Sequence, residues 1–337
     1  MKIYVAMPEG HIRNTFFTTH SKAVLDALGE VSYNPYDRQL TAEELRDILP
    51  GIDILIGGWG CTAITEEVLS KADALKIVAY TGGTVSGFAT DAVYERGIIV
   101  LSGNQVFAES VAESNICYMM AMLRQVPKYN DLMRLGGWKE PDYYSEGLMD
   151  KTVGIVGYGM TSKYLVKMLT PFHCEIKIYS GHLTQEEAAQ YGATLVSLDE
   201  IFETCDIISI QSSRTAATFH LVGEVQLKKM KDGALLVNTA RGNIIDEEAL
   251  IRELETGRIR AALDVYCKEP PATDNKLRYL PNVLTMPHMA GPTIDRRQHV
   301  TMALAKDIQA FIDGKKNNFF CQISSSYSKI MTKLETS

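Results

Sequence analysis

The sequence predicts an α/β protein made of two domains, each a doubly wound parallel sheet. Short apolar runs alternate with helical patterns along most of the chain, which is typical of strands joined by crossover helices. The chain has 337 residues, and this length exceeds what a single hydrophobic core usually serves. The alternation restarts near the middle of the chain, so we expect one sheet in each half.

The apolar runs of the first half predict buried strands, because a parallel strand covered on both faces is apolar throughout. Amphipathic segments such as 21–29 and 64–73 separate these runs, and Thr65 marks the expected start of the second helix. The strands of this half are expected at 2–7, 52–58, 75–83 and 97–103.

A longer helical pattern, residues 109–133, follows the first set of strands. It is apolar on much of its circumference, so we expect one long helix buried between domains or subunits. The second alternating set comes after it and predicts strands at 152–157, 175–180, 206–211, 234–239, 261–266 and 282–287.

Charge and composition exclude several classes of function. A formal net charge of -7 argues against a nucleic-acid or anionic-membrane partner, because both need a basic face. We expect no membrane span and no signal peptide. The six cysteines form no Cys-x-x-Cys pair and the seven histidines no ligand cluster, so we expect reduced thiols, a cytoplasmic location and no metal.

The stretch TVGIVGYGMTSKYL, residues 152–165, predicts a dinucleotide site, because a glycine turn joins a strand to a helix. Gly157 would allow the tight turn, and Gly159 would let the backbone approach a pyrophosphate. The amides of Met160 and Thr161 would then face the anion at the helix N-terminus. Ser162 takes the place of a third glycine and is small enough to pack there. The alternative is a glycine turn without a ligand.

The cofactor type depends on the end of the next strand, where an acidic residue normally binds the adenosine ribose. Ser180 stands there instead, followed by Gly181 and His182. The missing carboxylate removes repulsion toward a ribose 2′-phosphate, and His182 could add positive charge. Both NAD and NADP therefore remain open, with a slight preference for NADP. The alternative is that Ser180 binds the ribose of NAD while His182 is solvated.

Three later motifs place polar groups just after strands, where ligands bind in open α/β sheets. They are NTARG at 238–242, DVYCKEP at 264–270 and PHMAG at 287–291. In this order, and with the glycine turn, they closely resemble the D-isomer-specific 2-hydroxyacid dehydrogenases. The resemblance covers about residues 50–315 and is strongest over 150–295.

Reduction of a 2-oxoacid needs a hydride donor, a proton donor and a carboxylate clamp. His288 is the natural proton donor and acceptor, because imidazole titrates near neutral pH. Glu269 would stabilise the imidazolium form, and Arg241 offers a planar fork for carboxylate and carbonyl oxygens. Each has a structural alternative: a surface arginine, a turn glutamate and a buried histidine. The resemblance implies the catalytic roles for all three.

The resemblance also implies binding roles for other residues. It places the nicotinamide carboxamide on Asp264, with Arg241 and His288 nearby. Substrate carboxylate would meet the amides of Gly83 and Thr84, a glycine-rich turn that can form an anion nest; Trp59 could wall the pocket or belong to the core. The remaining cofactor contacts expected are Thr239, Ala240 and Gly291 around the ring, and Ser213 and Thr218 along the adenosine half.

Some departures from the family's pattern affect these expectations. Gln211, Ser213 and Arg214 stand where relatives commonly have His-x-Pro-Leu. Arg214 could reach a 2′-phosphate or be solvated. YSGH at 179–182 is similar to the Tyr-Ser/Thr-Gly-Arg signature of NADP-using glyoxylate and hydroxypyruvate reductases, with His in place of Arg.

The predicted organisation and function follow from this resemblance. We expect a flavodoxin-like substrate domain from 1–103 plus about 296–337, a dinucleotide-binding Rossmann domain from 104–295, and an active site in the cleft between them. The polar segment after about residue 320 has no assigned role. The leading prediction is an NAD(P)-dependent enzyme, homodimeric, that interconverts a 2-oxoacid and a D-2-hydroxyacid. The alternative is a cofactor-sensing corepressor-type binding protein of the same fold.

Overall fold

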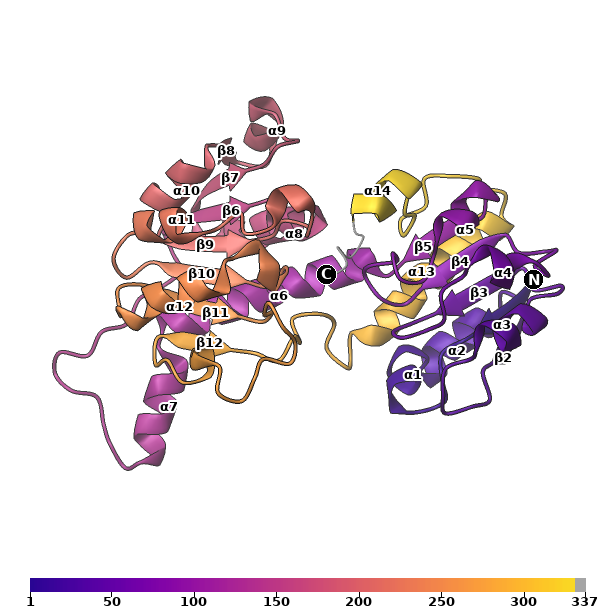
Figure 1. Ribbon diagram of the computed structural model, residues 1–337, viewed down its shortest axis with the longest axis horizontal. Coiled ribbons are helices and arrows are strands. Elements are labelled where there is room, and N and C mark those ends of the chain that lie inside the picture. Colours follow the sequence, from indigo (N-terminus) through magenta and orange to yellow (C-terminus); the bar gives the residue numbers. More distant parts are fainter. Residues whose placement is uncertain (331–337) are drawn as a thin grey trace. The chain divides into compact units, whose positions relative to one another are not determined.

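The computed structural model describes residues 1–330, and its contacts divide the chain into two compact units (Figure 1). Unit 1 comprises Met1–Ala108 and the segment from Pro292 onward, and unit 2 comprises Glu109–Gly291. The contacts thus divide the chain at 108/109 and 291/292, within a few residues of the boundaries expected from the sequence, at 103/104 and about 295/296.

The sheet of unit 1 has five parallel strands in the order β2-β1-β3-β4-β5. The four buried strands expected from apolar runs are present. The edge strand β2 was not expected, because its residues alternate between exposed and half-buried positions and form no apolar run. The strands are β1 (Lys2–Val5), β2 (Glu30–Tyr33), β3 (Ile54–Gly57), β4 (Ile77–Tyr80) and β5 (Ile99–Ser102).

The helices of unit 1 enclose a core of buried aliphatic and aromatic side chains, among them Phe16, Leu45 and Val300. Thr65 caps its helix as expected, since its hydroxyl accepts a hydrogen bond from the amide of Val68. The helices are α1 (His11–Phe16), α2 (Thr19–Asp26), α3 (Ala42–Ile48), α4 (Glu66–Leu69), α5 (Asp91–Glu95), α13 (Arg297–Ile312) and α14 (Ser325–Ile330).

The polar segment after residue 320 covers the edge of the unit 1 sheet. The Ser102 amide donates to the Cys321 carbonyl at 2.8 Å, and the Ile323 amide donates to the Val100 carbonyl at 2.9 Å. The buried carboxylate of Asp307 accepts the amide of Cys321 at 2.6 Å. This segment therefore closes the free edge of β5; residues 331–337 lie outside the described part of the chain.

The sheet of unit 2 has seven parallel strands in the order β12-β11-β10-β9-β6-β7-β8. All six strands expected in this half are present, and the short edge strand β8 was missed. The strand order reverses between β6 and β9, which is the position where doubly wound sheets bind nucleotides. The strands are β6 (Thr152–Val156), β7 (Glu175–Tyr179), β8 (Ala193–Leu195), β9 (Ile207–Ile210), β10 (Leu235–Asn238), β11 (Arg260–Leu263) and β12 (Val283–Thr285).

Helices cover both faces of this sheet. One core cluster packs the sheet against residues such as Phe202, Leu227 and Leu250, and the other against Met119 and Leu165. Besides the two helices that precede β6, the helices of unit 2 are α8 (Met160–Leu169), α9 (Gln185–Gln190), α10 (Leu198–Thr204), α11 (Glu224–Lys229) and α12 (Glu247–Glu255), with the 3₁₀ turns η1 (Thr170–Phe172), η2 (Ala216–Thr218), η3 (Gly242–Ile244) and η4 (Lys276–Arg278).

The single long helix expected over 109–133 is wrong. The structure has two helices, α6 (Asn104–Leu123) and α7 (Val126–Arg134), separated at Gln125, which has a left-handed φ of 51°. Pro127 explains the break, because its ring would clash with the carbonyl of the preceding turn in a continuous helix. None of the helices within residues 1–330, α6 included, has the length and apolar content needed to cross a bilayer.

Candidate active site

The glycine turn lies between β6 and α8. Gly157 has φ 99°, and a Cβ there would come within 2.7 Å of the Ser212 Cα, so only glycine fits. Helix α8 begins at Met160, and its first amides, those of Met160 and Thr161, have no acceptor within the helix. Ser162 is buried and donates to the Gly157 carbonyl at 2.9 Å. The serine thus ties the helix to the turn, and the turn fits a dinucleotide pyrophosphate.

The residues expected to bind the adenosine ribose, Ser180 and His182, follow the end of β7. The hydroxyl of Ser180 accepts a hydrogen bond from the His182 amide at 3.2 Å, which orders the short turn. Ser180 is half-buried and His182 is exposed. No carboxylate stands in this turn, so nothing there repels a 2′-phosphate.

The loop after β9 is held by its own hydroxyls. Thr218 donates to the Ser213 carbonyl at 2.7 Å and accepts the Thr215 amide at 2.8 Å. Arg214 is half-buried, and its charge helps to lower the pKa of Arg241.

The turn after β10 is shaped by the buried Asn238. Its side chain accepts the Ala240 amide at 3.1 Å and donates to the Arg241 carbonyl at 3.0 Å. A Cβ on Gly242 would come within 1.9 Å of the Tyr266 carbonyl carbon. Glycine is therefore required at this position, where the Arg241 turn packs against the loop after β11.

Arg241 stands in a charged environment. Desolvation lowers its pKa, the carboxylate of Glu269 opposes this shift, and the neighbouring Arg214 adds to it. Because the pKa of arginine ordinarily lies far above neutral pH, the guanidinium remains charged despite this shift. The guanidinium of Arg241 is thus close enough to the Glu269 carboxylate for the two charges to interact.

Glu269 and His288 form a direct pair. The Nδ1 atom of His288 lies 2.6 Å from Oε2 of Glu269, while Oε1 accepts the Tyr266 amide at 3.1 Å. The side chains of His288 and Glu269 are 50% and 35% exposed, respectively. With Nδ1 engaged, Nε2 is the imidazole nitrogen left to exchange a proton with a substrate.

Asp264 holds the loop that carries His288. The His288 amide donates to the Asp264 carbonyl, and the amides of Met289 and Ala290 donate to its carboxylate, all at 2.9 Å. His288 itself has a left-handed φ of 51°. Burial raises the pKa of Asp264, and the two amide hydrogen bonds oppose that shift. The expected carboxamide role would use the remaining acceptor capacity of this carboxylate.

Sequence reasoning missed two polar residues on α6. Asn115 donates to the Thr239 hydroxyl at 2.8 Å, and the Tyr118 hydroxyl donates to Asp264 at 3.3 Å. Both side chains are buried. Polar residues three apart share one face of a helix, so their presence in an apolar helix was the available signal.

The expected substrate turn in unit 1 follows β4. The hydroxyl of Ser102 donates to the Gly82 and Gly83 carbonyls at 3.2 and 2.7 Å. These bonds fix the peptide planes of the turn, and a glycine-rich turn of this kind can present its amides to an anion, as expected for Gly83 and Thr84. Trp59 is 40% exposed, so it is no core residue; a Cβ on Gly82 would lie 3.1 Å from its indole nitrogen, which places Trp59 beside the turn.

Comparisons with known proteins agree on one family. The model of the NAD-binding domain of D-isomer specific 2-hydroxyacid dehydrogenases matches residues 116–290. D-3-phosphoglycerate dehydrogenase of Archaeoglobus fulgidus is 36% identical over 248 residues, which cover 73% of this chain and 47% of that protein. The chain thus spans about half the length of such relatives.

Solved structures share the fold over nearly the whole chain. A phosphoglycerate oxidoreductase from Rhizobium etli has a TM-score of 0.81 at 22% identity, covering 97% of this chain and 98% of that one. An NAD-dependent formate dehydrogenase from Staphylococcus aureus in complex with NAD has a TM-score of 0.69 at 25% identity, covering 93% and 95%.

Proposed function

The chain belongs to the D-isomer specific 2-hydroxyacid dehydrogenase family, and on this premise we propose that it interconverts a 2-oxoacid and a D-2-hydroxyacid. The observation that carries the proposal is the 2.6 Å contact between His288 and Glu269, with Arg241 in the electrostatic reach of the same glutamate. This set supplies a proton donor, its acidic partner and a carboxylate clamp.

The proposed roles follow from the atoms that remain available. A bound nicotinamide cofactor supplies or accepts the hydride. His288 gives a proton from Nε2 to the carbonyl oxygen during reduction, and Glu269 stabilises the imidazolium form. Arg241 orients the substrate through its guanidinium fork, while the amides of Gly83 and Thr84 bind the substrate carboxylate.

We further propose a modest preference for NADP over NAD. Ser180 and His182 replace the acidic residue that would repel a 2′-phosphate. Ser180→Asp should therefore weaken the binding of NADPH more than the binding of NADH. A ratio of the two affinities that is unchanged, or that shifts toward NADPH, would contradict the preference.

The decisive experiment is a side-by-side assay of NADH and NADPH oxidation over a panel of 2-oxoacids. The panel should include glyoxylate, pyruvate, hydroxypyruvate and larger aliphatic and aromatic members. Turnover with at least one member is expected. Cofactor binding without any turnover would overturn the enzyme proposal and favour a cofactor-sensing binding protein.

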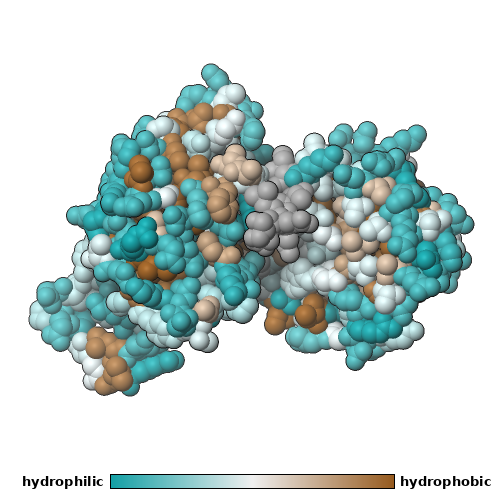
Figure 2. Space-filling view, in the orientation of Figure 1, coloured by the Kyte–Doolittle hydropathy of each residue, from teal (hydrophilic) through white to brown (hydrophobic). Residues whose placement is uncertain are grey.

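We also propose a homodimer built through helices α6 and α7. Helix α7 buries none of its residues. Together with the chain that follows it, residues 126–145, it forms an arm with exposed apolar and aromatic side chains. Figure 2 shows a group of brown, hydrophobic atoms at the lower left, where α7 lies in Figure 1. The most exposed of them are Val126 (54%), Met133 (54%), Leu135 (87%), Trp138 (67%) and Tyr144 (62%).

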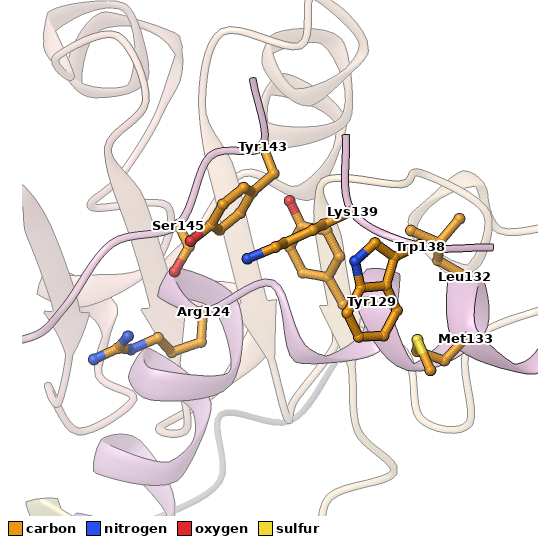
Figure 3. Close-up of a pocket in the computed structure, with 8 residues that line it drawn as sticks. All are labelled: Arg124, Tyr129, Leu132, Met133, Trp138, Lys139, Tyr143 and Ser145. Carbon is orange, nitrogen blue, oxygen red and sulfur yellow. The ribbon is translucent and has the colours of Figure 1, made fainter. Parts of the chain in front are cut away.

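The arm also contains a hollow of about 230 Å³. Figure 3 shows Trp138 beside Leu132 and Met133, with Tyr129 and Lys139 next to them. Lys139 lies 4.7 Å from the Tyr143 ring centroid. An exposed apolar surface of this kind, rimmed by polar groups, is typical of a protein interface. A second copy is the proposed occupant.

The proposed location is the cytoplasm. All six cysteines are free thiols in the structure, and free thiols persist in reducing compartments. The acidic net charge of -7 favours small-molecule chemistry over binding to nucleic acids or anionic membranes.

A further inference from the structure

Helix α6 bonds to three of the loops that carry the proposed active site. Ser114 donates to the Ala290 carbonyl at 3.1 Å, Asn115 to Thr239 at 2.8 Å, and Tyr118 to Asp264 at 3.3 Å. These partners follow the strands β12, β10 and β11, respectively. One polar face of a single helix thus reaches the ends of three adjacent strands.

Asn115 is the centre of a buried polar cluster. Its side-chain carbonyl accepts Ser209 at 2.8 Å and Gln211 at 3.1 Å, and its amide donates to Thr239 and to the Val111 carbonyl. Asn115 and Ser209 are fully buried. Because every polar atom of Asn115 is paired, this cluster is rigid, and removing the amide would leave buried groups unpaired.

The cluster also orients Thr239. Its oxygen accepts both Asn115 at 2.8 Å and the Gln211 amide at 3.0 Å. With both acceptor positions of the hydroxyl taken, its own proton must point in a third direction. Thr239 stands directly after β10, two residues before Arg241, where the nicotinamide ring is expected.

Tyr118 acts on the neighbouring loop. Asp264, which accepts its hydroxyl, also holds the amides of Met289 and Ala290, and thereby the left-handed turn at His288. Burial and the adjacent carboxylate raise the pKa of Tyr118. The phenol therefore stays protonated and keeps donating to Asp264.

The strand order separates these contacts from the adenosine half of the cofactor site. The glycine turn follows β6, and the turn of Ser180 and His182 follows β7. Thr239, Asp264 and His288 follow β10, β11 and β12, which lie on the other side of β9. Helix α6 bonds to the second group. A dinucleotide lying across this edge would have its nicotinamide half over the loops that α6 holds.

We propose that Asn115 and Tyr118 are positioning residues for the nicotinamide half of the cofactor. Asn115 acts through Thr239 and Gln211, and Tyr118 acts through Asp264 and the His288 loop. Neither residue is catalytic, since each works through another side chain. This inference rests on the proposed dehydrogenase function.

The test compares NADH with ADP-ribose, which lacks the nicotinamide. Calorimetry measures the affinity for each ligand in Asn115→Leu, Tyr118→Phe and a control, Cys117→Ser, whose side chain is exposed on α6. If the wild-type protein prefers NADPH, the pair compared is NADPH and 2′-phospho-ADP-ribose. Asn115→Leu and Tyr118→Phe should each lower the affinity for the reduced cofactor by about tenfold. Each should change the affinity for ADP-ribose by less than about twofold. Cys117→Ser should change neither.

Equal losses for both ligands would show a general structural defect and overturn the proposal, as would unchanged affinity for both in the two variants. Tyr118→Phe removes a single oxygen, so it keeps the test decisive if Asn115→Leu fails to fold. Failure of the wild-type protein to bind NADH or NADPH would instead contradict the proposed function. Wild-type turnover with an unchanged ratio of affinities in the variants would contradict this inference alone.

Discussion

The Nδ1 atom of His288 lies 2.6 Å from Oε2 of Glu269, and this contact determines which imidazole nitrogen can meet a substrate. The carboxylate holds Nδ1, and the backbone amide of His288 is bound to the Asp264 carbonyl at 2.9 Å. The segment that follows β11 therefore fixes both the ring and the backbone of His288. That degree of positioning is expected of a proton donor and exceeds what a surface histidine needs.

Replacing His288 should abolish most of the activity. His288→Ala removes the proton donor, so kcat should fall by about 10²–10⁴-fold, while affinity for NADH or NADPH changes only modestly. Steady-state kinetics and cofactor titration measure the two effects. Near-normal turnover in this variant would remove the assignment of His288 and, with it, the main support for the proposed reaction.

Gly242 should tolerate no side chain. A Cβ at this position would come within 1.9 Å of the Tyr266 carbonyl carbon, so Gly242→Ala must displace either the Arg241 turn or the loop that carries Glu269. We expect a loss of about 1–3 kcal/mol in the free energy of unfolding, together with reduced kcat/KM. Gly87→Ala is the matched control, since a Cβ there meets nothing within 4 Å. Equal urea midpoints for the two variants would refute the packing argument.

Charging the arm should separate the proposed dimer. Leu135 and Trp138 are 87% and 67% exposed, so Leu135→Asp and Trp138→Lys would leave the core of unit 2 intact while placing charge in the apolar contact. Light scattering should report a dimer for the wild-type protein and a monomer for the double variant at the same concentration. A monomeric wild-type protein, or a dimer that survives both charges, argues against this interface.

The stability of unit 2 should depend on pH through Glu146. Burial pushes the pKa of this carboxyl upward, but hydrogen bonds and charges from Lys151 and Arg260, at 2.5 and 2.7 Å, outweigh burial and lower it. A depressed folded pKa means that the stabilisation is present above the unfolded value of about 4.3. It is lost as the pH falls through the folded pKa.

The corresponding variant is Glu146→Gln, with the exposed Glu140→Gln as control. At pH 7 the Glu146 variant should lose about 1–3 kcal/mol of unfolding free energy, because two cations lose a charged acceptor. The difference from wild type should shrink as the pH is lowered through the acidic range. Urea unfolding at several pH values measures the unfolding free energies of both proteins. A difference between them that stays constant with pH would contradict the role of the ion pairs.

Much of the fold was predictable from local patterns. The buried strands were visible because a parallel strand covered on both faces is apolar throughout, as in β3 and β9. The edge strands β2 and β8 were missed, since a half-exposed strand has no such run. The break at Gln125 was missed because apolar periodicity continued across Pro127, although the proline itself was the signal.

The sequence by itself determined the family, the glycine turn and the three motifs that carry Arg241, Glu269 and His288, because each is a contiguous stretch of residue types. Only the tertiary structure decided how these stretches are held together. Asn115 and Tyr118 lie more than 100 residues from Thr239 and Asp264 in the chain, and their hydrogen bonds arise because parallel strands end at one edge of a sheet. Contacts between residues so far apart depend on strand order, which no local pattern encodes.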